Sequence, residues 1–238
     1  MQFSPKLTWL IFLFITLISC NKNPESSANG TDDQMVDIEG NVYQTVKIGN
    51  QVWMKENLRV THYRNGDDIP NVQDDSSWID LTTGAYCAYE NDESNISIYG
   101  ILYNWHAVGD TRNIAPEGWH IPTDQEWKEL EMYLGLSRNE ADDKSWQGTD
   151  QGSQLKATSG WANDGNGTNT SGFSALPGGY RYGYTGAFGS IDSSTSCWSS
   201  SQSGALYAWF RNLSYSTSKV RRSSSNRQSG YSVRCVRD

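Results

Sequence analysis

The stretch from Gly118 to Leu134, GWHIPTDQEWKELEMYL, constrains the fold of this chain most, because its signals for a strand, a turn and a helix all agree. Pro122 ends the extended run, since proline has no backbone N–H to donate and keeps the preceding residue out of the helical region. Thr123 and Glu126 stand at the spacing of a capping box, in which each side chain bonds the backbone N–H of the other residue. The sequence therefore predicts a helix that begins directly after Thr123.

The apolar residues of this helix predict its buried face and its end. Trp127, Leu130 and Leu134 recur at helical spacing, which is typical of a helix with one face in the core. Gly135 follows directly and is the residue type that most often ends a helix.

The start of the chain has the pattern of an export signal. A weakly basic residue, Lys6, precedes a mostly apolar run over residues 7–18, which is short for a membrane span of about 20 residues. The run ends in Leu-Ile-Ser-Cys at Cys20 and resembles a bacterial lipobox, so we expect lipidation of Cys20 and a place in the cell envelope, at the outer membrane or cell surface. The alternative is an ordinary secretory signal that happens to end in cysteine. Residues 1–20 are then the signal peptide, polar residues 21–38 predict a flexible tether, and residues 39–238 form the domain.

Composition predicts a loop-rich domain whose core is built from aromatic rings. Mean hydropathy is −0.66, while 10 Trp and 13 Tyr contribute to an aromatic content of 12%. Residues 43–59 predict a hairpin with its turn at Gly49-Asn50, and residues 99–108 predict a second helix. Short strands then follow one another from residue 173 onward. The expected fold class is therefore α+β, with two main helices and short, mostly antiparallel strands.

Charge is distributed unevenly along the chain. The formal net charge is −8, yet residues 211–238 hold seven basic residues and one acid. We interpret these basic residues as solvated strand faces whose charges meet acids elsewhere in the fold, because nucleic-acid binding would need a denser patch and a known motif. Alternation of apolar and polar residues over 231–235 predicts a last strand that pairs centrally, beside the N-terminal hairpin or the strand of Cys197.

Three cysteines remain if Cys20 is lipidated: Cys87, Cys197 and Cys235. An exported protein favours at least one disulfide. We expect a bond between Cys197 and Cys235, since both lie in the strand-rich half, with Cys87 as the alternative partner. No two cysteines have the spacing of a zinc or redox motif.

The histidines predict structural roles. His62, His106 and His120 are far apart in the sequence, with no pair at metal-ligand spacing. No Gly-x-Ser-x-Gly elbow marks a nucleophile either. The sequence thus offers no convergent catalytic set.

One loop has the composition of a calcium site. Asp164, Asn166 and Thr168 alternate through NDGNGTN and mimic the first half of a calcium loop, and residues 90–93 are a weaker candidate. The twelfth position is Ala175, which excludes an EF-hand, and tight turns use the same residues for conformational reasons. We expect a turn and no resident cofactor, with a lectin-like calcium site as the alternative.

Aromatic residues next to turns are the candidate ligand contacts. Trp161, Tyr180, Tyr182 and Tyr184 lie among turns and polar residues, an arrangement often found on surfaces that bind sugars, because rings stack on the apolar faces of sugars. For any one of them, a place in a ring-rich core is the simpler interpretation.

Six local patterns together identify a family: VKIGNQVWMKENL, YGILYNWHAV, APEGWHIPTDQEW, GFSALPGGYR, CWSSS and GYSVRCVRD. From about Gly40 to Asp238 the chain resembles the Fibrobacter succinogenes major paralogous domain of exported proteins and lipoproteins in Bacteroidetes and Fibrobacteres. The order of motifs is also similar to the formylglycine-generating, sulfatase-modifying fold, a variant of the C-type-lectin-like fold.

The resemblance implies a C-type-lectin-like fold in which the first and last strands pair, with residues 46–48 beside residues 232–236. Many family members have cysteine where this chain has Ala115. If that cysteine pairs with the one in the terminal strand, the resemblance implies that Cys235 lacks its usual partner here and that Cys197 or Cys87 replaces it.

These observations favour a non-enzymatic binding or adhesion module, held at the cell envelope by its lipid, with glycan or protein ligands. A polysaccharide-acting enzyme is the first alternative, and it would need two carboxylates roughly 5–10 Å apart in a groove. A structural envelope scaffold without a small ligand is the second.

Overall fold

The computed structural model describes residues 1–2 and 34–238 of the chain. The export signal, Cys20 and residues 21–33 of the expected tether lie outside the described residues. Among the described helices, none has the length and apolar character needed to cross a membrane. The tether was expected to reach residue 38, but β1 (Gln34–Val36) already pairs antiparallel with β2 (Val42–Ile48) and buries Met35. The folded part therefore includes Gln34.

The first sheet joins the N-terminal hairpin to the last strand, in the order β1-β2-β3-β13-β6. Its other members are β3 (Gln51–Met54), β13 (Val236–Arg237) and β6 (Trp119–His120). The expected hairpin and the central place of the last strand are both confirmed, because Val236 pairs with Trp53 on one side and His120 on the other. The pairing of residues 46–48 with residues 232–236 that the family resemblance implies is wrong. Strand β3 lies between β2 and β13, so Val46 pairs with Trp53.

The second sheet is formed mainly by the second half of the domain, in the order β7-β12-β11-β10-β8-β9. Its strands are β7 (Ser145–Gln147), β12 (Val220–Asn226), β11 (Tyr207–Ser214), β10 (Ser194–Gln202), β8 (Gly178–Arg181) and β9 (Phe188–Ile191). All neighbours are antiparallel except β8 and β10, which meet in parallel at Gly179 and Thr195. A third, two-stranded sheet pairs β4 (Tyr86–Cys87) with β5 (Leu102–Tyr103).

The residues just before β13 connect these sheets. Tyr231 forms an antiparallel bridge with Tyr103 of β5, and Ser232 forms a parallel bridge with Cys197 of β10. The polypeptide then enters the first sheet at Val236. This segment therefore contacts all three sheets within a few residues.

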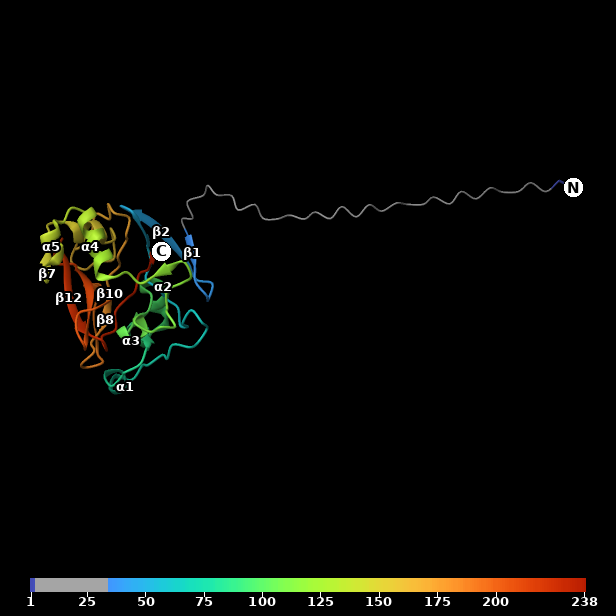
Figure 1. The fold of residues 1–238 in the computed structure, drawn as a ribbon, viewed down its shortest axis with the longest axis horizontal. Helices are drawn as coiled ribbons and strands as arrows, with labels where there is room; N and C mark the ends of the chain where they lie inside the picture. The colour runs from blue at the N-terminus through green and yellow to red at the C-terminus, as the bar shows by residue number, and fades with distance from the viewer. Residues whose placement is uncertain (3–33) are drawn as a thin grey trace. The chain divides into compact units, whose positions relative to one another are not determined.

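The helices are short, and the longest is the one that the capping signals predict. They are α1 (Asp75–Ile79), α2 (Ile96–Tyr99), α3 (Trp105–Val108), α4 (Asp124–Tyr133), α5 (Arg138–Asp142) and α6 (Gln151–Leu155), with 3-10 turns at Tyr89–Asn91 and Glu93–Asn95. The capping box of α4 is confirmed, since Thr123 Oγ1 accepts from Glu126 N and Glu126 Oε2 accepts from Thr123 N at 2.8 Å. Figure 1 shows α4 and α5 together beside the strands of the second sheet.

The second long helix, expected over residues 99–108, is wrong. Gly100 has φ of 76°, a left-handed conformation that ends α2, and a Cβ there would lie 2.7 Å from Asn57 Cβ. Asn104 then begins a new helix, because its side chain accepts from Ala107 N at 3.0 Å. Residues 102–103 between these two helices form β5 instead. The fold is a mixed α and β fold with one principal helix and many antiparallel strands.

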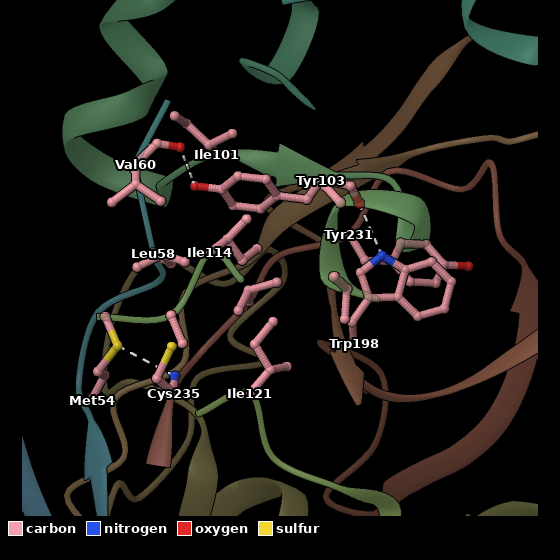
Figure 2. Close-up of a cluster of buried hydrophobic side chains, with 14 of the residues drawn as sticks. Met54, Leu58, Val60, Ile101, Tyr103, Ile114, Ile121, Trp198, Tyr231 and Cys235 are labelled. Atoms are coloured by element: carbon pink, nitrogen blue, oxygen red, sulfur yellow. Dashed lines mark hydrogen bonds between the residues drawn. The ribbon is translucent and has the colours of Figure 1, made fainter. Parts of the chain in front are cut away.

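Two large clusters of buried side chains form the core. The first lies around Tyr103 and Trp198; its Tyr103 hydroxyl donates to Val60 O at 2.7 Å, and its Trp198 indole donates to Tyr103 O at 2.9 Å (Figure 2). The second lies under α4, where Trp127 packs against Trp53 at 4.8 Å and Phe173 at 5.9 Å between ring centroids. Aromatic rings supply the largest side chains of both clusters, in agreement with the composition.

Candidate functional site

Two pairs of tyrosines, with three of the four side chains exposed, lie where β8 turns into β9 and where β11 begins. In the first pair, the hydroxyls of Tyr180 and Tyr182 are 3.1 Å apart and the ring centroids are 5.0 Å apart, edge to face. Tyr180 is half-buried on Tyr231, whereas Tyr182 is 45% exposed. The hydrogen bond to Tyr180, together with burial, raises the pKa of Tyr182 to about 12, so this phenol is protonated at neutral pH.

The second pair joins the turn between β8 and β9 to the start of β11. The hydroxyls of Tyr184 and Tyr207 are 3.5 Å apart, and the two side chains are 71% and 43% exposed. Leu206, directly before Tyr207, is 70% exposed. The sequence interpretation did not include Tyr207 as a contact, although its place at the start of an alternating strand could have indicated an outward side chain. We call Tyr180, Tyr182, Tyr184 and Tyr207 the tyrosine surface.

A tight turn positions the tyrosine surface. Tyr182 N donates to Ala187 O at 2.8 Å, and Gly186 N donates to Tyr182 O at 2.9 Å, which closes the turn around Tyr184. Gly183 packs so closely on β12 that a Cβ there would lie 2.4 Å from Asn226 Oδ1. The turn therefore presents both Tyr182 and Tyr184 as exposed side chains.

Trp161 is not part of this surface. Its side chain is only 4% exposed, it packs in the second core cluster, and its indole donates to Ala175 O at 3.1 Å. The prediction of a ligand contact at Trp161 is therefore wrong, and its place in a ring-rich core is confirmed.

The candidate calcium loop is held by hydrogen bonds of its own. Asn166 Oδ1 accepts from Trp161 N at 3.0 Å, and Thr168 Oγ1 donates to Ser153 O at 3.3 Å. Asp164 adopts the left-handed conformation, with φ of 57°. The Lys156 ammonium donates to three carbonyls, among them Gly165 O at 2.7 Å, so a protein cation already uses an oxygen of this loop. Over residues 34–238, no three His, Cys, Asp or Glu side chains are grouped to hold a metal ion.

The three cysteines of the domain are buried free thiols, so the expected bond between Cys197 and Cys235 is not formed in this structure. Cys197 packs in the second core cluster and Cys235 in the first, together with Ala115. Burial raises the pKa of Cys87 to about 12 and that of Cys197 to about 11, and it also raises the pKa of Cys235. All three are thus protonated thiols at neutral pH.

Buried acids beside α4 are bound to arginines. Asp124 Oδ1 accepts from Arg211 Nη1 at 2.8 Å, and Asp124 Oδ2 accepts from Arg222 Nη2 at 2.7 Å. Glu131 Oε1 accepts from Arg211 Nε at 2.5 Å. Burial disfavours the Asp124 carboxylate, but Arg222 and Arg211 outweigh it and lower the pKa of Asp124 to about 2. We call these four residues the α4 ion cluster; its acids are engaged and do not resemble the open carboxylate pair that a glycosidase needs.

The histidines take positions that fit structural roles. His120 lies between two carboxylates, with Nε2 2.7 Å from Glu126 Oε1 and Nδ1 2.6 Å from Asp238 Oδ1. His62 is held in the same way between Glu39 and Asp68. Both ring nitrogens of each are therefore occupied. His106 lies apart from them in α3, with burial lowering its pKa.

Comparison with known proteins gives one match. Residues 46–237 match the family described as the Fibrobacter succinogenes major domain. The searches of curated proteins and of solved structures each return no match.

Proposed function

Since the chain belongs to the Fibrobacter succinogenes major domain family, whose name states no activity, we propose its function from its surface: a non-enzymatic module that binds glycans at the tyrosine surface. The observation that carries this proposal is the exposure of Tyr182, Tyr184 and Tyr207 on one turn and the adjoining strand. Exposed apolar groups that gather in one region of a surface often mark a binding site.

The chemistry of the rings suits a sugar. Each tyrosine offers a flat apolar face, on which the C–H side of a pyranose can stack, and a hydroxyl that both donates and accepts. In the Tyr180–Tyr182 pair, the hydroxyl contact at 3.1 Å and the edge-to-face packing of the rings orient the two side chains before any ligand arrives. Preorganisation of this kind lowers the entropy lost on binding.

The proposal includes the address and the finer fold. A lipid on Cys20 would hold the domain at the cell envelope, at the outer membrane or cell surface, where it would meet glycans of the envelope or of the surroundings. The arrangement of a capped helix, Gly-rich turns and a central last strand supports a C-type-lectin-like fold. If Cys20 carries the lipid, Cys20→Ser moves the protein out of the membrane fraction, and retention of this variant in membranes contradicts the anchor.

A glycan array probed with the full chain in detergent tests the binding function. We expect binding to at least one neutral oligosaccharide, and Tyr184→Ala to weaken it by roughly tenfold, which corresponds to about 1.4 kcal/mol. Tyr133→Ala is the matched control, because Tyr133 is a 66% exposed tyrosine on α4, outside the tyrosine surface. An equal loss in both variants, or no glycan bound at all, contradicts the proposal.

A further inference from the structure

Arg234 is a buried cation whose hydrogen-bond partners are all neutral. Its guanidinium donates from Nε to Asn57 Oδ1 at 2.8 Å, from Nη1 to Phe173 O, and from Nη2 to Ser174 O at 3.2 Å. The side chain is 2% exposed, and its guanidinium carbon lies 4.3 Å from the centre of the Phe173 ring. Three of the five guanidinium N–H groups are used in this way, which leaves one on each Nη atom.

The other buried arginines of the domain differ from Arg234 in one respect. Arg181 pairs with Asp75 at 2.8 Å, and Arg211 and Arg222 pair with the acids of the α4 ion cluster. No carboxylate within residues 34–238 lies at ion-pairing distance from Arg234. A buried charge is costly unless an opposite charge compensates it, and the positive charge of Arg234 lacks such a partner among residues 34–238.

A pocket of about 240 Å³ opens onto this cation. Arg234 and Lys55 bring two positive charges to its lining, and Glu56 brings one negative charge. Glu56 Oε2 already accepts from Gln44 N at 2.8 Å. Ile98 and Leu176 add apolar wall, and Ile98 is 57% exposed. The pocket thus combines a net positive lining with an apolar side.

We propose that this pocket binds a small organic carboxylate, with the Arg234 guanidinium as the counter-charge at its floor. The guanidinium keeps one N–H on each Nη atom that these three hydrogen bonds do not use, and a carboxylate is an anion whose charge and acceptor oxygens suit arginine. The apolar wall favours a carboxylate on a carbon skeleton over an inorganic anion. This site does not depend on glycan binding by the tyrosine surface.

The protonation of Arg234 supports the same interpretation. Burial lowers the pKa of Arg234 to about 10, and the Glu56 carboxylate on the same pocket lining does not offset this effect. The cation persists at neutral pH but lacks full compensation. An incoming carboxylate would supply that compensation and stabilise the folded protein.

Glucuronate is a suitable probe, with glucose as the neutral compound of similar size. We expect glucuronate to raise the melting temperature of the full chain in detergent and to give saturable binding by calorimetry, while glucose and sodium chloride at equal ionic strength do neither. Equal shifts with chloride and glucuronate would overturn the site, and so would the absence of any shift.

An internal carboxylate tests the location. Ser174 lines the pocket with φ of 59°, a conformation that aspartate tolerates, and its hydroxyl accepts from Asn169 Nδ2 at 2.8 Å, a bond that aspartate can also accept. Ser174→Asp should compensate Arg234 from within, raise the melting temperature and weaken glucuronate binding more than about tenfold.

The control places the same new charge elsewhere. Asn163→Asp adds one negative charge at an exposed residue with φ of 49° that does not line the pocket. We expect this variant to keep the wild-type affinity for glucuronate. If Ser174→Asp and Asn163→Asp bind glucuronate equally well, the carboxylate does not sit at Arg234 and the proposal fails.

Discussion

Arg211 and Arg234 are both buried arginines from the second half of the chain, but carboxylates neutralise the charge of Arg211 and only neutral groups bind Arg234. Arg211 lies between Asp124 and Glu131, with charged bonds of 2.8 Å and 2.5 Å. Burial opposes its charge, but Glu131 and Asp124 outweigh burial and raise the pKa of Arg211. The hydrogen-bond partners of Arg234 are carbonyl and amide oxygens, and its pKa is lowered.

The difference separates a structural charge from one that can receive a ligand. In the α4 ion cluster each charge is satisfied inside the protein, so the cluster fixes the helix on the second sheet and has no capacity for a ligand. At Arg234, three hydrogen bonds hold the guanidinium in place, but their neutral acceptors do not compensate its positive charge. Burial alone therefore does not decide whether an arginine is structural.

Removal of the charge should have the largest effect in the α4 ion cluster. Arg211→Met leaves the fully buried Glu131 without its cation, and we expect a loss of about 3–5 kcal/mol in the free energy of unfolding. Urea denaturation followed by tryptophan fluorescence measures it. A loss below about 1 kcal/mol would show that Glu131 is not ionised in the folded protein.

The equivalent change at the other arginine should cost less. Arg234→Met strands no carboxylate and leaves only carbonyl and amide acceptors unpaired, so we expect a loss of about 1–3 kcal/mol by the same measurement. Equal losses in the two variants would remove the distinction between the two sites.

The cap of α4 should contribute a smaller amount. Thr123→Ala removes the hydroxyl that accepts from Glu126 N and should cost about 1 kcal/mol. Because α4 also carries Asp124 and Glu131, the double variant with Arg211→Met should deviate from the sum of the two single losses. Strict additivity would indicate that the cap and the ion cluster act independently.

The smallest expected effect concerns the pH dependence of stability, to which His120 contributes. Burial opposes protonation, but hydrogen bonds to Asp238 and Glu126 outweigh it and raise the pKa of His120 above its ordinary value of 6.5. The folded state therefore binds this proton more tightly than the unfolded state does. The resulting stability is complete below pH 6.5 and is lost as the pH rises through the raised folded pKa.

Melting curves between pH 5 and 9, roughly the range in which histidine titrates, test this sign. His120→Gln should flatten the fall in melting temperature above pH 6.5. His106→Gln should leave that fall in place, because no carboxylate among residues 34–238 pairs with His106. An unchanged profile in His120→Gln would contradict the assigned role of the two carboxylates.

Local signals were enough to predict the parts of this fold that short-range chemistry controls. Thr123 and Glu126 define the start of α4, Gly135 follows its end, and the turn at Gly49 defines the first hairpin. The helix expected over residues 99–108 failed for the same kind of reason, since Gly100 favours a left-handed conformation over a continuous helix. Gly100 is therefore a signal in the sequence that the helix ends before residue 101.

The parts that could not be predicted depend on contacts between distant segments. Tyr184, in the turn after β8, meets Tyr207 at the start of β11, and no local pattern contains both. The basic residues near the last strands were interpreted as solvated, which is wrong for Arg211, Arg222 and Arg234, although the first two do meet acids as expected. Burial of an arginine depends on which helix or loop covers the strand, and sequence alternation does not carry that information.

The segment that connects the three sheets also affects how fast the protein can fold. Ser232 and Arg234 bind Asn57 across sequence separations of 175 and 177 residues, and Val236 completes the first sheet beside Trp53. Contacts between such distant residues require closure of a very long loop before they stabilise anything, and folding slows as the mean separation of contacts increases. The hairpin and α4 can form early from local signals, but the sheets join only when this last segment arrives.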